Sequence, residues 1–453
     1  MSQADFPSPW RANYALLLLL LAYILSFIDR NVMAVLIGPI RSDFAISDFQ
    51  YSLLHGFAFS MFYIVMGLPI ARLADRHSRK WIVTVGLVAW SLMTCLCGTA
   101  RSFFTLFLAR IGVGVGEATL SPAAFSMLGD LFPKEKLARA LSIYSLGITL
   151  GGGLAYVVGS TVYEWFASAE QLVLPLFGEV RPWQMTFIAV GAPGFILAIF
   201  LGFLSEPVRR SGTVAAGTPA AGAPVAGTPA AGAPEVHHGL AEIGAHLRRH
   251  FRAYMAPIGS VAVLGILGYG TMAWYPEFLI RTFDMPRGEA GSQFGLMFLI
   301  AGSAGTLVGG WSVEPLMRRG YQDAPLRIIL AVSALWILPA VLGPLSGSPT
   351  MAVWMAAPIV FFLNAHYGVG VAAVQFITPN RMRAQVSALM LFVTNLFGLA
   401  FGPTAVAMLT DFVFGDDLAL RYSLAVLPLL VCPLAIVLVL QGMRGYRQAA
   451  DLE

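Results

Sequence analysis

Four charged side chains lie within long apolar stretches and are the groups in this sequence best suited to proton or anion chemistry. Asp29 and Arg30 are adjacent, deep in an apolar run that begins near Ala12. Arg110 and Glu117 are seven residues apart in another run, which is two helical turns and places them on one face of a helix. A charge at the bilayer centre costs at least roughly 2.5–3.5 kcal/mol, so such residues usually face a protein interior or a water-filled path. We expect the four to form a neutral network.

Two carboxylates beside two arginines can act as a proton switch. Burial favours the protonated form of a carboxylate, whereas a neighbouring arginine favours the ionised form. If the arginines move between conformations, the proton affinity of Asp29 and Glu117 changes with them, so we hypothesise that these two residues couple proton movement to a conformational change. A purely structural ion-pair cluster is the alternative. The sequence contains no His/Asp/Ser set and no metal-ligand spacing, and we predict neither an enzyme nor a cofactor.

The elements that must position these residues are transmembrane helices. Of the 453 residues, 57% are hydrophobic and only 11% are charged, and the mean hydropathy is +0.74, which excludes an ordinary soluble protein. A helix of about 20 apolar residues spans a hydrocarbon core roughly 30 Å thick. We predict an all-α membrane protein with twelve such helices, at residues 13–39, 50–72, 81–100, 103–128, 138–163, 183–205, 254–281, 290–313, 326–346, 351–376, 384–410 and 420–442.

The distribution of Lys and Arg predicts the orientation of these helices. Twenty of the 28 basic residues fall on the side that holds both termini, and six fall on the other side. Because basic loops stay in the cytoplasm, we expect both termini to be cytoplasmic, with an uncleaved first helix. This topology accounts for the net charge of +4, and no nucleic-acid partner is required. The absence of any N-x-Ser/Thr acceptor favours a bacterial inner membrane.

The chain divides into two halves of six spans. We predict an N-terminal bundle over 1–206, a cytoplasmic linker over 207–253 and a C-terminal bundle over 254–453. The linker repeats AGTPAAGAP at 216–224 and 226–234, a composition that cannot form a packed core. Its last part, from Leu240 to Phe251, has one apolar and one basic face, which predicts a short helix on the membrane surface.

A charged motif occurs once in each half. The motif consists of an acid followed by two adjacent basic residues, and it lies after the second span and again after the eighth. Each residue of the second copy is 239 positions after its counterpart in the first. The residues are Asp75, Arg76, Arg79 and Lys80 in the first half and Glu314, Arg318 and Arg319 in the second. A weaker echo pairs 133–136 with 379–382. Such internal duplication is typical of transporters whose binding site lies at the midplane.

The segment from Ala71 to Lys80 resembles the loop-2/3 motif of the major facilitator superfamily, although Ala71 and Ser78 stand where the family usually has Gly. The resemblance implies two pseudo-symmetric six-helix bundles that rock against each other to give alternating access. It also implies that the charged residues of the motif form an intracellular latch, a breakable ionic lock that stabilises the outward-facing state.

A narrower resemblance is to the spinster branch of the superfamily, which exports sphingolipids and lysophospholipids. It rests on Asp29-Arg30, on Gly114-Val-Gly116-Glu117-Ala118 and on Gly129-Asp130-Leu131-Phe132, and it is strongest over the first six spans. The resemblance implies that Asp29 and Glu117 are the proton-coupling carboxylates. Arg30 and Arg110 are then their charge partners and candidate ligands for an anionic headgroup.

The second half has few ionisable residues within its spans. Candidates for lining a cavity are Tyr269, Trp274, Glu277, Asn364, His366, Gln375 and Asn395. One charged half and one apolar half suit an amphipathic substrate. We therefore predict a monomeric, proton-coupled transporter of a lysophospholipid or sphingoid-type lipid that interacts with membrane lipids. The alternatives are a proton symporter of a small hydrophilic organic anion and, from another class, a lipid scramblase or a non-transporting membrane sensor.

Overall fold

A computed structural model describes residues 6–169, 173–174, 178–209, 240–379 and 382–450. The linker repeats at 216–234, and positions 380 and 381 of the weaker echo, lie outside the described residues. Within the described residues, twelve helices are long and apolar enough to cross a membrane, which confirms the predicted number. The chain is a multi-pass integral membrane protein.

The N-terminal half places six spans in order along the chain. Its helices are α1 (Pro9–Asn31), η2 (Val32–Val35), α2 (Ile37–Phe44), α3 (Asp48–Ser52), η3 (Leu53–Phe57), α4 (Ala58–Arg76), α5 (Arg79–Cys97), α6 (Phe103–Glu117), α7 (Leu120–Leu131), α8 (Lys134–Ala167) and α9 (Pro182–Gly202). Between α8 and α9 lies a small antiparallel hairpin of β1 (Val173–Leu174) and β2 (Gly178–Glu179).

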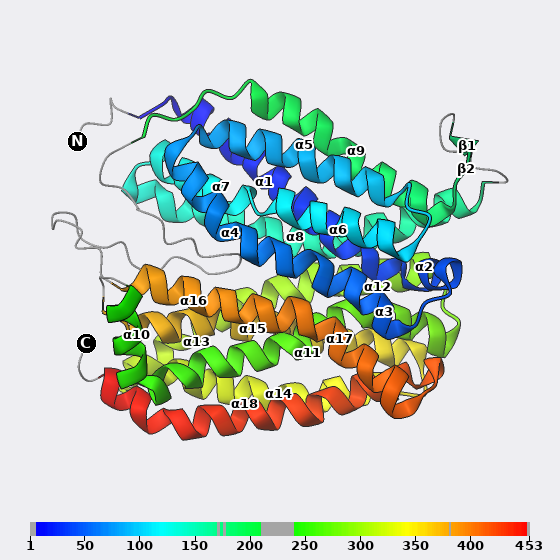
Figure 1. Ribbon diagram of the computed structural model, residues 1–453. Helices are drawn as coiled ribbons and strands as arrows, with labels where there is room; N and C mark the ends of the chain where they lie inside the picture. The colour runs from blue at the N-terminus through cyan, green and yellow to red at the C-terminus, as the bar shows by residue number, and fades with distance from the viewer. Residues whose placement is uncertain (1–5, 170–172, 175–177, 210–239, 380–381, 451–453) are drawn as a thin grey trace.

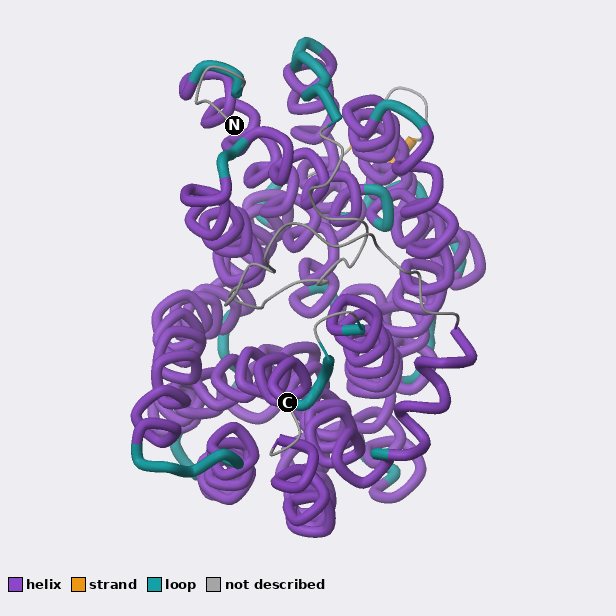
Figure 2. Tube along the Cα trace, turned by 90° about the vertical axis from the view of Figure 1, so that its left-hand side faces the viewer, coloured by secondary structure: helices purple, strands orange, loops and turns teal. Residues whose placement is uncertain are grey.

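The C-terminal half follows the short helix α10 (Leu240–Arg249), which occupies the region predicted to be amphipathic. Its helices are α11 (Phe251–Phe283), α12 (Arg287–Met297), η4 (Phe298–Gly302), α13 (Ser303–Arg318), α14 (Ala324–Leu345), α15 (Pro349–Phe376), α16 (Arg383–Asn395), η5 (Leu396–Phe401), α17 (Gly402–Met408), η6 (Leu409–Phe414), η7 (Asp417–Ala419) and α18 (Leu420–Ala450). In Figure 1 the two halves lie one above the other, and Figure 2 views the same two layers from the end that carries the termini.

The two ends of the molecule differ in what they carry. Both chain termini and α10 lie at one end, here called the terminal end, and α2, α3 and the β-hairpin lie at the other, here called the far end (Figure 1). Polar side chains cap the starts of helices. The Ser47 side chain accepts a hydrogen bond from the backbone amide of Gln50, and the Ser102 side chain accepts one from the backbone amide of Thr105. These caps satisfy amide groups that have no partner inside the helix.

Close approach of backbones joins the two halves at two seams. At one seam, the π-helical turn η3 packs on the π-helical turn η5, and a Cβ added to Gly56 would lie 2.6 Å from the carbonyl oxygen of Leu399. At the other seam, α8 packs on α12 and η4, where a Cβ on Gly291 would lie 2.6 Å from the Ser160 side chain. π-Helical turns are rare and are frequent at functional sites.

Candidate functional site

The predicted charge network forms where α1 meets α6. Glu117 is the last residue of α6, and its Oε2 accepts hydrogen bonds from Arg30 Nη2 at 2.8 Å and from Ser26 Oγ at 2.6 Å. The side chains of Arg30 and Glu117 are only 8% and 0% exposed. The structure therefore contains a buried ion pair between residues 87 positions apart in sequence.

Aromatic rings surround the guanidinium of Arg30. Its Cζ lies 4.7 Å from the ring centroids of Phe27 and Phe59 and 4.9 Å from that of Tyr63. A cation over an aromatic face is attracted by the ring quadrupole, more strongly when desolvated. These contacts hold Arg30 in place while leaving some of its hydrogen-bonding capacity unused.

Asp29 and Arg110 make weaker mutual contacts than the first pair. The Asp29 carboxylate accepts from Thr94 Oγ1 at 3.3 Å, and Arg110 Nη1 donates to the Asp29 backbone carbonyl at 3.3 Å. Both residues are buried. The site as a whole thus combines one formed ion pair with an acid and a base that are close but, within the described chain, not ion-paired.

Several polar atoms of this network lack a hydrogen-bond partner among the described residues. They are Asp29 Oδ1, Arg30 Nε, Glu117 Oε1 and both Nε and Nη2 of Arg110. An unpaired buried polar group is costly, and such groups cluster where a ligand, a proton or another conformation satisfies them. The network therefore has unused capacity to bind an anion or a proton.

A small cavity of about 10 Å³ adjoins Arg30 where the two halves meet. That volume is close to the least that holds one water molecule. The N-terminal half contributes polar and aromatic groups, and the C-terminal half contributes mainly apolar ones. The lining residues are Arg30, Asn31, His55, Gly56 and Phe59 on the first side and Tyr269, Met272, Leu399 and Pro403 on the second.

Of the three candidates on α11, Tyr269 lines this cavity. Trp274 is buried, and its indole Nε1 donates to the carbonyl of Pro403 at 2.8 Å, which joins α11 to α17 within the second half. Glu277 lies at the far end, where it pairs with Arg281 at 3.0 Å.

The four candidates on α15 and α16 have different surroundings. The half-buried Asn364 donates to its own helix, to the Val360 carbonyl at 2.9 Å. His366 is buried with its ring centroid 5.5 Å from that of Trp336 on α14, so it faces the inside of the C-terminal half. Gln375 is half-buried near the end of α15, and Asn395 is buried at the end of α16, next to η5.

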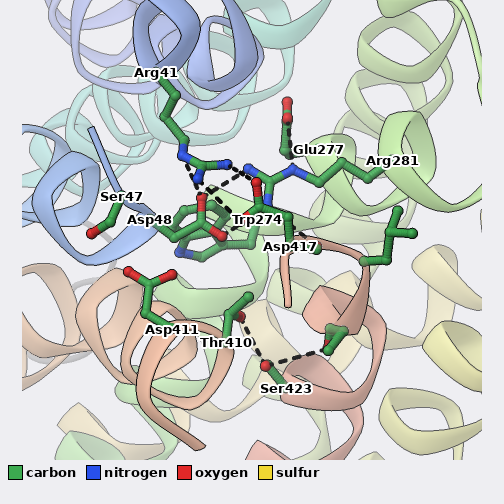
Figure 3. A network of polar contacts seen from close by, with 12 residues as sticks. Arg41, Ser47, Asp48, Trp274, Glu277, Arg281, Thr410, Asp411, Asp417 and Ser423 are labelled. Carbon is green, nitrogen blue, oxygen red and sulfur yellow. Dashed lines mark hydrogen bonds and ion pairs between the residues drawn. The ribbon is translucent and has the colours of Figure 1, made fainter. Parts of the chain in front are cut away.

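At the far end, a cluster of ion pairs crosses between the halves. We call Arg41, Asp48, Glu277, Arg281, Arg287 and Asp417 the far-end charge cluster. Arg281 on α11 contacts Asp48 on α3 with both Nη atoms, at 2.7 and 2.8 Å. Figure 3 shows Arg41 reaching Asp48 from above and Arg281 reaching it from the right.

A second two-pronged contact joins Arg41 to Asp417 at 2.9 and 3.0 Å, and Arg41 Nε also lies 3.0 Å from Asp48. Arg287 contacts Glu277 at 3.2 Å and the Val35 carbonyl at 2.8 Å. Bidentate Arg–carboxylate contacts are the stronger kind of charge-assisted hydrogen bond. The cluster therefore fastens the N-terminal half to the C-terminal half at this end.

Further contacts between the halves lie on the same side of the molecule. The Asp411 carboxylate accepts from the Phe49 amide at 2.7 Å, at the start of α3, and Tyr156 donates its hydroxyl to the Met272 carbonyl at 2.8 Å.

The sequence did not predict the far-end charge cluster, because its arginines were counted only as topology signals. The position of Asp48 at the first turn of a helix, with basic residues at the ends of neighbouring spans, is the signal that could have revealed it.

At the terminal end, the predicted latch residues are bound within the N-terminal half. Arg79 begins α5 and pairs with Asp130 at the end of α7, and its Nε lies 3.1 Å from Glu206, just after α9. Lys80 Nζ donates to the Gly202 carbonyl at 3.2 Å. The sequence had not identified Glu206 as part of this group.

Asp75 and Arg76 end α4 with exposed side chains. The Asp75 backbone carbonyl, rather than its carboxylate, accepts from Arg209, which also donates to the Ala74 and His77 carbonyls at 2.6 Å. Arg209 thus satisfies the last carbonyls of α4, a favourable place for a cation.

Glu206 is held ionised by its surroundings. Partial burial of the carboxylate raises its pKa, but hydrogen bonds from Ser78, from the Lys80 amide and from Arg79 outweigh burial and set the pKa of Glu206 below its usual value. The Ser78 hydroxyl donates at 2.6 Å. Glu206 therefore stays charged at neutral pH and joins the start of α5 to the end of α9.

The C-terminal half contains a corresponding group with the charges exchanged. Asp323 precedes α14 and pairs with Arg327 at 2.8 Å and with Arg447 near the end of α18 at 2.6 Å. Burial raises the pKa of Asp323, but hydrogen bonds and charge from these two arginines outweigh burial. The pKa of Asp323 is therefore below its usual value. In the N-terminal half an Arg at the start of the third span, α5, pairs with a Glu after the sixth span, α9. In the C-terminal half an Asp before the third span, α14, pairs with an Arg on the sixth span, α18.

The remaining latch candidates lie on the surface of the second half. Glu314 and Arg318 form an exposed pair at 2.5 Å within α13, and Arg319 follows the last residue of that helix. Arg79 begins a helix, whereas Arg318 ends one, so the constant sequence offset does not give equivalent structural positions. The latch role of these residues stays a prediction.

The chain matches the family described as Major Facilitator Superfamily over residues 19–403. It is 30% identical over 441 residues to an MFS-type efflux pump of Mycolicibacterium smegmatis (strain ATCC 700084 / mc(2)155), covering 96% of this chain and 92% of the relative. It is 23% identical over 408 residues to a probable L-galactonate transporter of Escherichia coli (strain K12), covering 90% and 84%.

Among solved structures, the chain is similar to a bacterial homologue of the human lysosomal transporter Spinster, in an inward-facing and unoccupied conformation. The TM-score is 0.77 and the identity 26%, and each chain is covered to 98%. The predicted fold and the resemblance to the spinster branch are confirmed by these comparisons.

Proposed function

The chain belongs to the Major Facilitator Superfamily, and from this membership we propose that it is a proton-coupled secondary transporter of an amphipathic lipid, of the lysophospholipid or sphingoid type. In this proposal the two halves rock against each other, and the terminal end faces the cytoplasm of a bacterial inner membrane. Members of this family are transporters, not enzymes.

One observation supports the proposal most directly: the buried Arg30–Glu117 pair lies beside a cavity between the two halves, and both partners retain unused hydrogen-bonding atoms. The charges lie on the N-terminal side of that cavity, and the C-terminal side is mostly apolar. The cavity as it stands has room for about one water molecule. Once the halves move apart, an anionic headgroup against Arg30 and a hydrocarbon chain against the opposite wall would match this division. The resemblance to the spinster branch implies the same class of substrate.

The pair also supplies a coupling mechanism. Within the described chain, the one ion-pair partner of Glu117 is Arg30. An anionic headgroup that recruits Arg30 would leave Glu117 buried without a counter-charge, and a buried carboxylate in that situation takes up a proton. Headgroup binding and protonation would therefore occur together, and Asp29 provides a second carboxylate in the same region.

The contacts between halves suggest which side is open. Ion pairs between the halves lie at the far end, whereas the groups around Arg79 and Asp323 at the terminal end each stay within one half. An alternating-access cycle would break the far-end charge cluster and join the halves at the terminal end. This arrangement corresponds to an inward-facing state in our proposed orientation.

Reconstituted vesicles test the proposal. Flux of lysophospholipids and sphingoid phosphates is measured with and without a pH gradient for the native chain, Asp29→Asn and Glu117→Gln. Glu289→Gln is the surface control, because Glu289 is exposed and its carboxylate accepts from Gln293, four residues along the same helix. We expect gradient-dependent flux in the native chain and in the control, and loss of gradient dependence in the two variants. Unchanged gradient dependence in both variants would refute the coupling role, and flux in both directions without a gradient would indicate a scramblase.

The second candidate is proton symport of a small hydrophilic organic anion, which is favoured by the likeness to the probable L-galactonate transporter. The Arg30–Glu117 pair could serve a carboxylate as well as a lipid headgroup. Saturable uptake of sugar acids would favour this candidate if added lysolipids do not inhibit that uptake. A membrane sensor would show binding without any flux.

A further inference from the structure

An apolar groove of about 760 Å³ runs along the outside of the N-terminal half. Its walls are α4 and α5, its floor is α6, and these helices lie together in the upper layer of Figure 1. The lining residues are Ile70, Leu73, His77, Ser78, Trp81, Ile82, Val85, Gly86, Ala89, Met93, Gly112, Val115, Gly116 and Thr119. All come from one half, so the groove is separate from the cavity between the halves and does not depend on the proposed function.

Small residues create this groove by letting α6 approach α5. A Cβ on Gly116 would lie 2.7 Å from the Cβ of Trp90, and a Cβ on Gly112 would lie 2.5 Å from Met93 Sδ. Gly and Ala at such positions let backbones come close in membranes. Because α6 lies this deep, the surface between α4 and α5 is hollowed instead of filled.

The groove has the dimensions of a lipid chain. Along α5 it extends from Trp81 to Met93, which is about 18 Å at 1.5 Å per residue. One leaflet of the hydrocarbon core is about 15 Å thick. The groove thus begins at the terminal end and reaches the bilayer midplane, and within the membrane its apolar lining suits hydrocarbon.

The mouth of the groove is basic. Lys80 Nζ lies 4.6 Å from the centroid of the Trp81 ring, which lines the groove. Arg76 and His77 are exposed beside it, and the Arg209 guanidinium is bound to the carbonyls at the end of α4. Of the acids nearby, Glu206 is bound by Ser78 and Arg79. Asp75 is exposed at the end of α4 and is outnumbered by the basic residues Arg76, Lys80 and Arg209. The charge at the mouth is complementary to an anionic headgroup.

From these observations we propose that the groove holds one acyl chain of a resident anionic phospholipid from the leaflet at the terminal end, with its headgroup phosphate at Lys80. The acyl chain of this lipid lies between α4 and α5. The buried carboxylates Asp29 and Glu117 lie on the opposite face of α5 and α6. The occupant is a membrane lipid and not the transported substrate, because the groove opens to the bilayer and not to the seam between the halves.

Spin-labelled lipid tests this site. The chain is reconstituted in phosphatidylcholine vesicles containing a minor fraction of phosphatidylglycerol with a nitroxide on its acyl chain, and the motionally restricted lipid per protein is measured. Ala89→Trp fills the groove, whereas Val88→Trp places the same ring on the lipid-facing side of α5, outside the groove. We expect the most strongly held component to disappear in Ala89→Trp and to remain in Val88→Trp.

Lys80→Gln tests the headgroup contact. One basic residue near an anionic surface contributes about 1 kcal/mol, so the preference for phosphatidylglycerol over labelled phosphatidylcholine should fall about fivefold. Equal retention by Ala89→Trp and Val88→Trp would overturn the groove assignment. Equal retention of both lipids by the native chain would overturn the anionic headgroup.

A measurement on the native chain avoids any effect of the variants on folding. Phosphatidylglycerol with a diazirine on its acyl chain is photo-crosslinked, and the modified residues are identified by peptide mass spectrometry. Adducts concentrated at Val85, Ala89 and Met93 support the site. Adducts spread evenly over the lipid-facing residues of α5, α9 and α14 would contradict it.

Discussion

Arg110 donates to the backbone carbonyl of Asp29, 3.3 Å away, and within the described residues it makes no ion pair with the Asp29 carboxylate. The two buried carboxylates of the site are therefore held differently. Glu117 has a guanidinium and a hydroxyl as partners, whereas Asp29 has the Thr94 hydroxyl. This difference predicts that equivalent changes at the two carboxylates will have unequal effects.

Glu117→Gln should destabilise the protein strongly. The change leaves the Arg30 guanidinium buried without its counter-charge, and removing one partner of a buried pair costs about 3–5 kcal/mol. Unfolding is measured in detergent, together with Arg30→Gln and the double variant. The double variant should recover much of the loss, and losses that simply add would show that the pair has no net coupling.

Asp29→Asn should leave stability within about 1 kcal/mol of the native chain. The amide oxygen can still accept from Thr94, and Arg110 keeps its bond to the Asp29 backbone carbonyl, which the substitution does not alter. The same unfolding measurement checks this expectation. A loss as large as that of Glu117→Gln would mean that Asp29 and Arg110 act as an ion pair.

Gly56→Ala should loosen the seam between η3 and η5. The added methyl would lie 2.6 Å from the Leu399 carbonyl oxygen, closer than the seam allows, so the two π-helical turns must separate. Gly67→Ala on α4 is the matched control, because a Cβ there meets nothing within 4 Å and should stabilise the helix by about 0.5–1 kcal/mol. Melting temperatures that shift in the same direction for both variants would contradict the close contact.

Arg281→Gln should open the far end. It removes both contacts to Asp48 and one to Glu277, which favours conformations in which the halves are apart. Losing one partner of a buried charge pair costs about 2–5 kcal/mol, so the open population should rise at least about tenfold. Distances between spin labels on the exposed residues Ser42 and Leu418 report the change.

Arg421→Gln is the control for that measurement. Arg421 lies at the same end but donates to the Pro344 and Ser346 carbonyls of its own half, at 3.2 and 2.9 Å. It should leave the label distances unchanged. The same distance distribution in Arg281→Gln as in the control would mean that the far-end charge cluster does not hold the halves together.

The ion pair between Arg79 and Glu206 should make the terminal end sensitive to acid. The pKa of Glu206 is lower in the folded protein than in the unfolded chain. The contribution of Glu206 to the free energy of unfolding is therefore fully present at a pH above the ordinary glutamate pKa of about 4.3, and it is lost as the pH falls through the lowered pKa. The difference in unfolding free energy between the native chain and Glu206→Gln should be constant at neutral pH and shrink below about pH 4. A difference that grows on acidification would reverse the assigned sign.

The sequence predicted the midplane charges because their depth follows from counting along a helix. Residue spacing at 1.5 Å per residue places Asp29, Arg110 and Glu117 within roughly 10 Å of the midplane. Counting does not give the direction in which each side chain points, which is why the bond from Arg110 to a carbonyl could not be predicted. The contact of Arg30 with Glu117 required only that α1 and α6 be neighbours.

The far-end charge cluster could not be predicted in the same way. Arg281 and Asp48 are separated by 233 residues, and each lies at the end of a span, where a charge is ordinary. Pairing across the halves depends on how the bundles are docked, which no local pattern encodes. The sequence predicted Glu277 only as a candidate for lining the cavity, and its partner Arg287 was counted only as a topology signal.

The exchanged charges of the two terminal-end groups also concern how the bundles assemble. In the N-terminal half the third span presents Arg79 to Glu206, and in the C-terminal half it presents Asp323 to Arg447. A third span that docked against the sixth span of the wrong half would bring Arg79 to Arg447, or Asp323 to Glu206. Like charges at such a contact repel each other, so these residues disfavour the pairing of a third span from one half with the sixth span of the other.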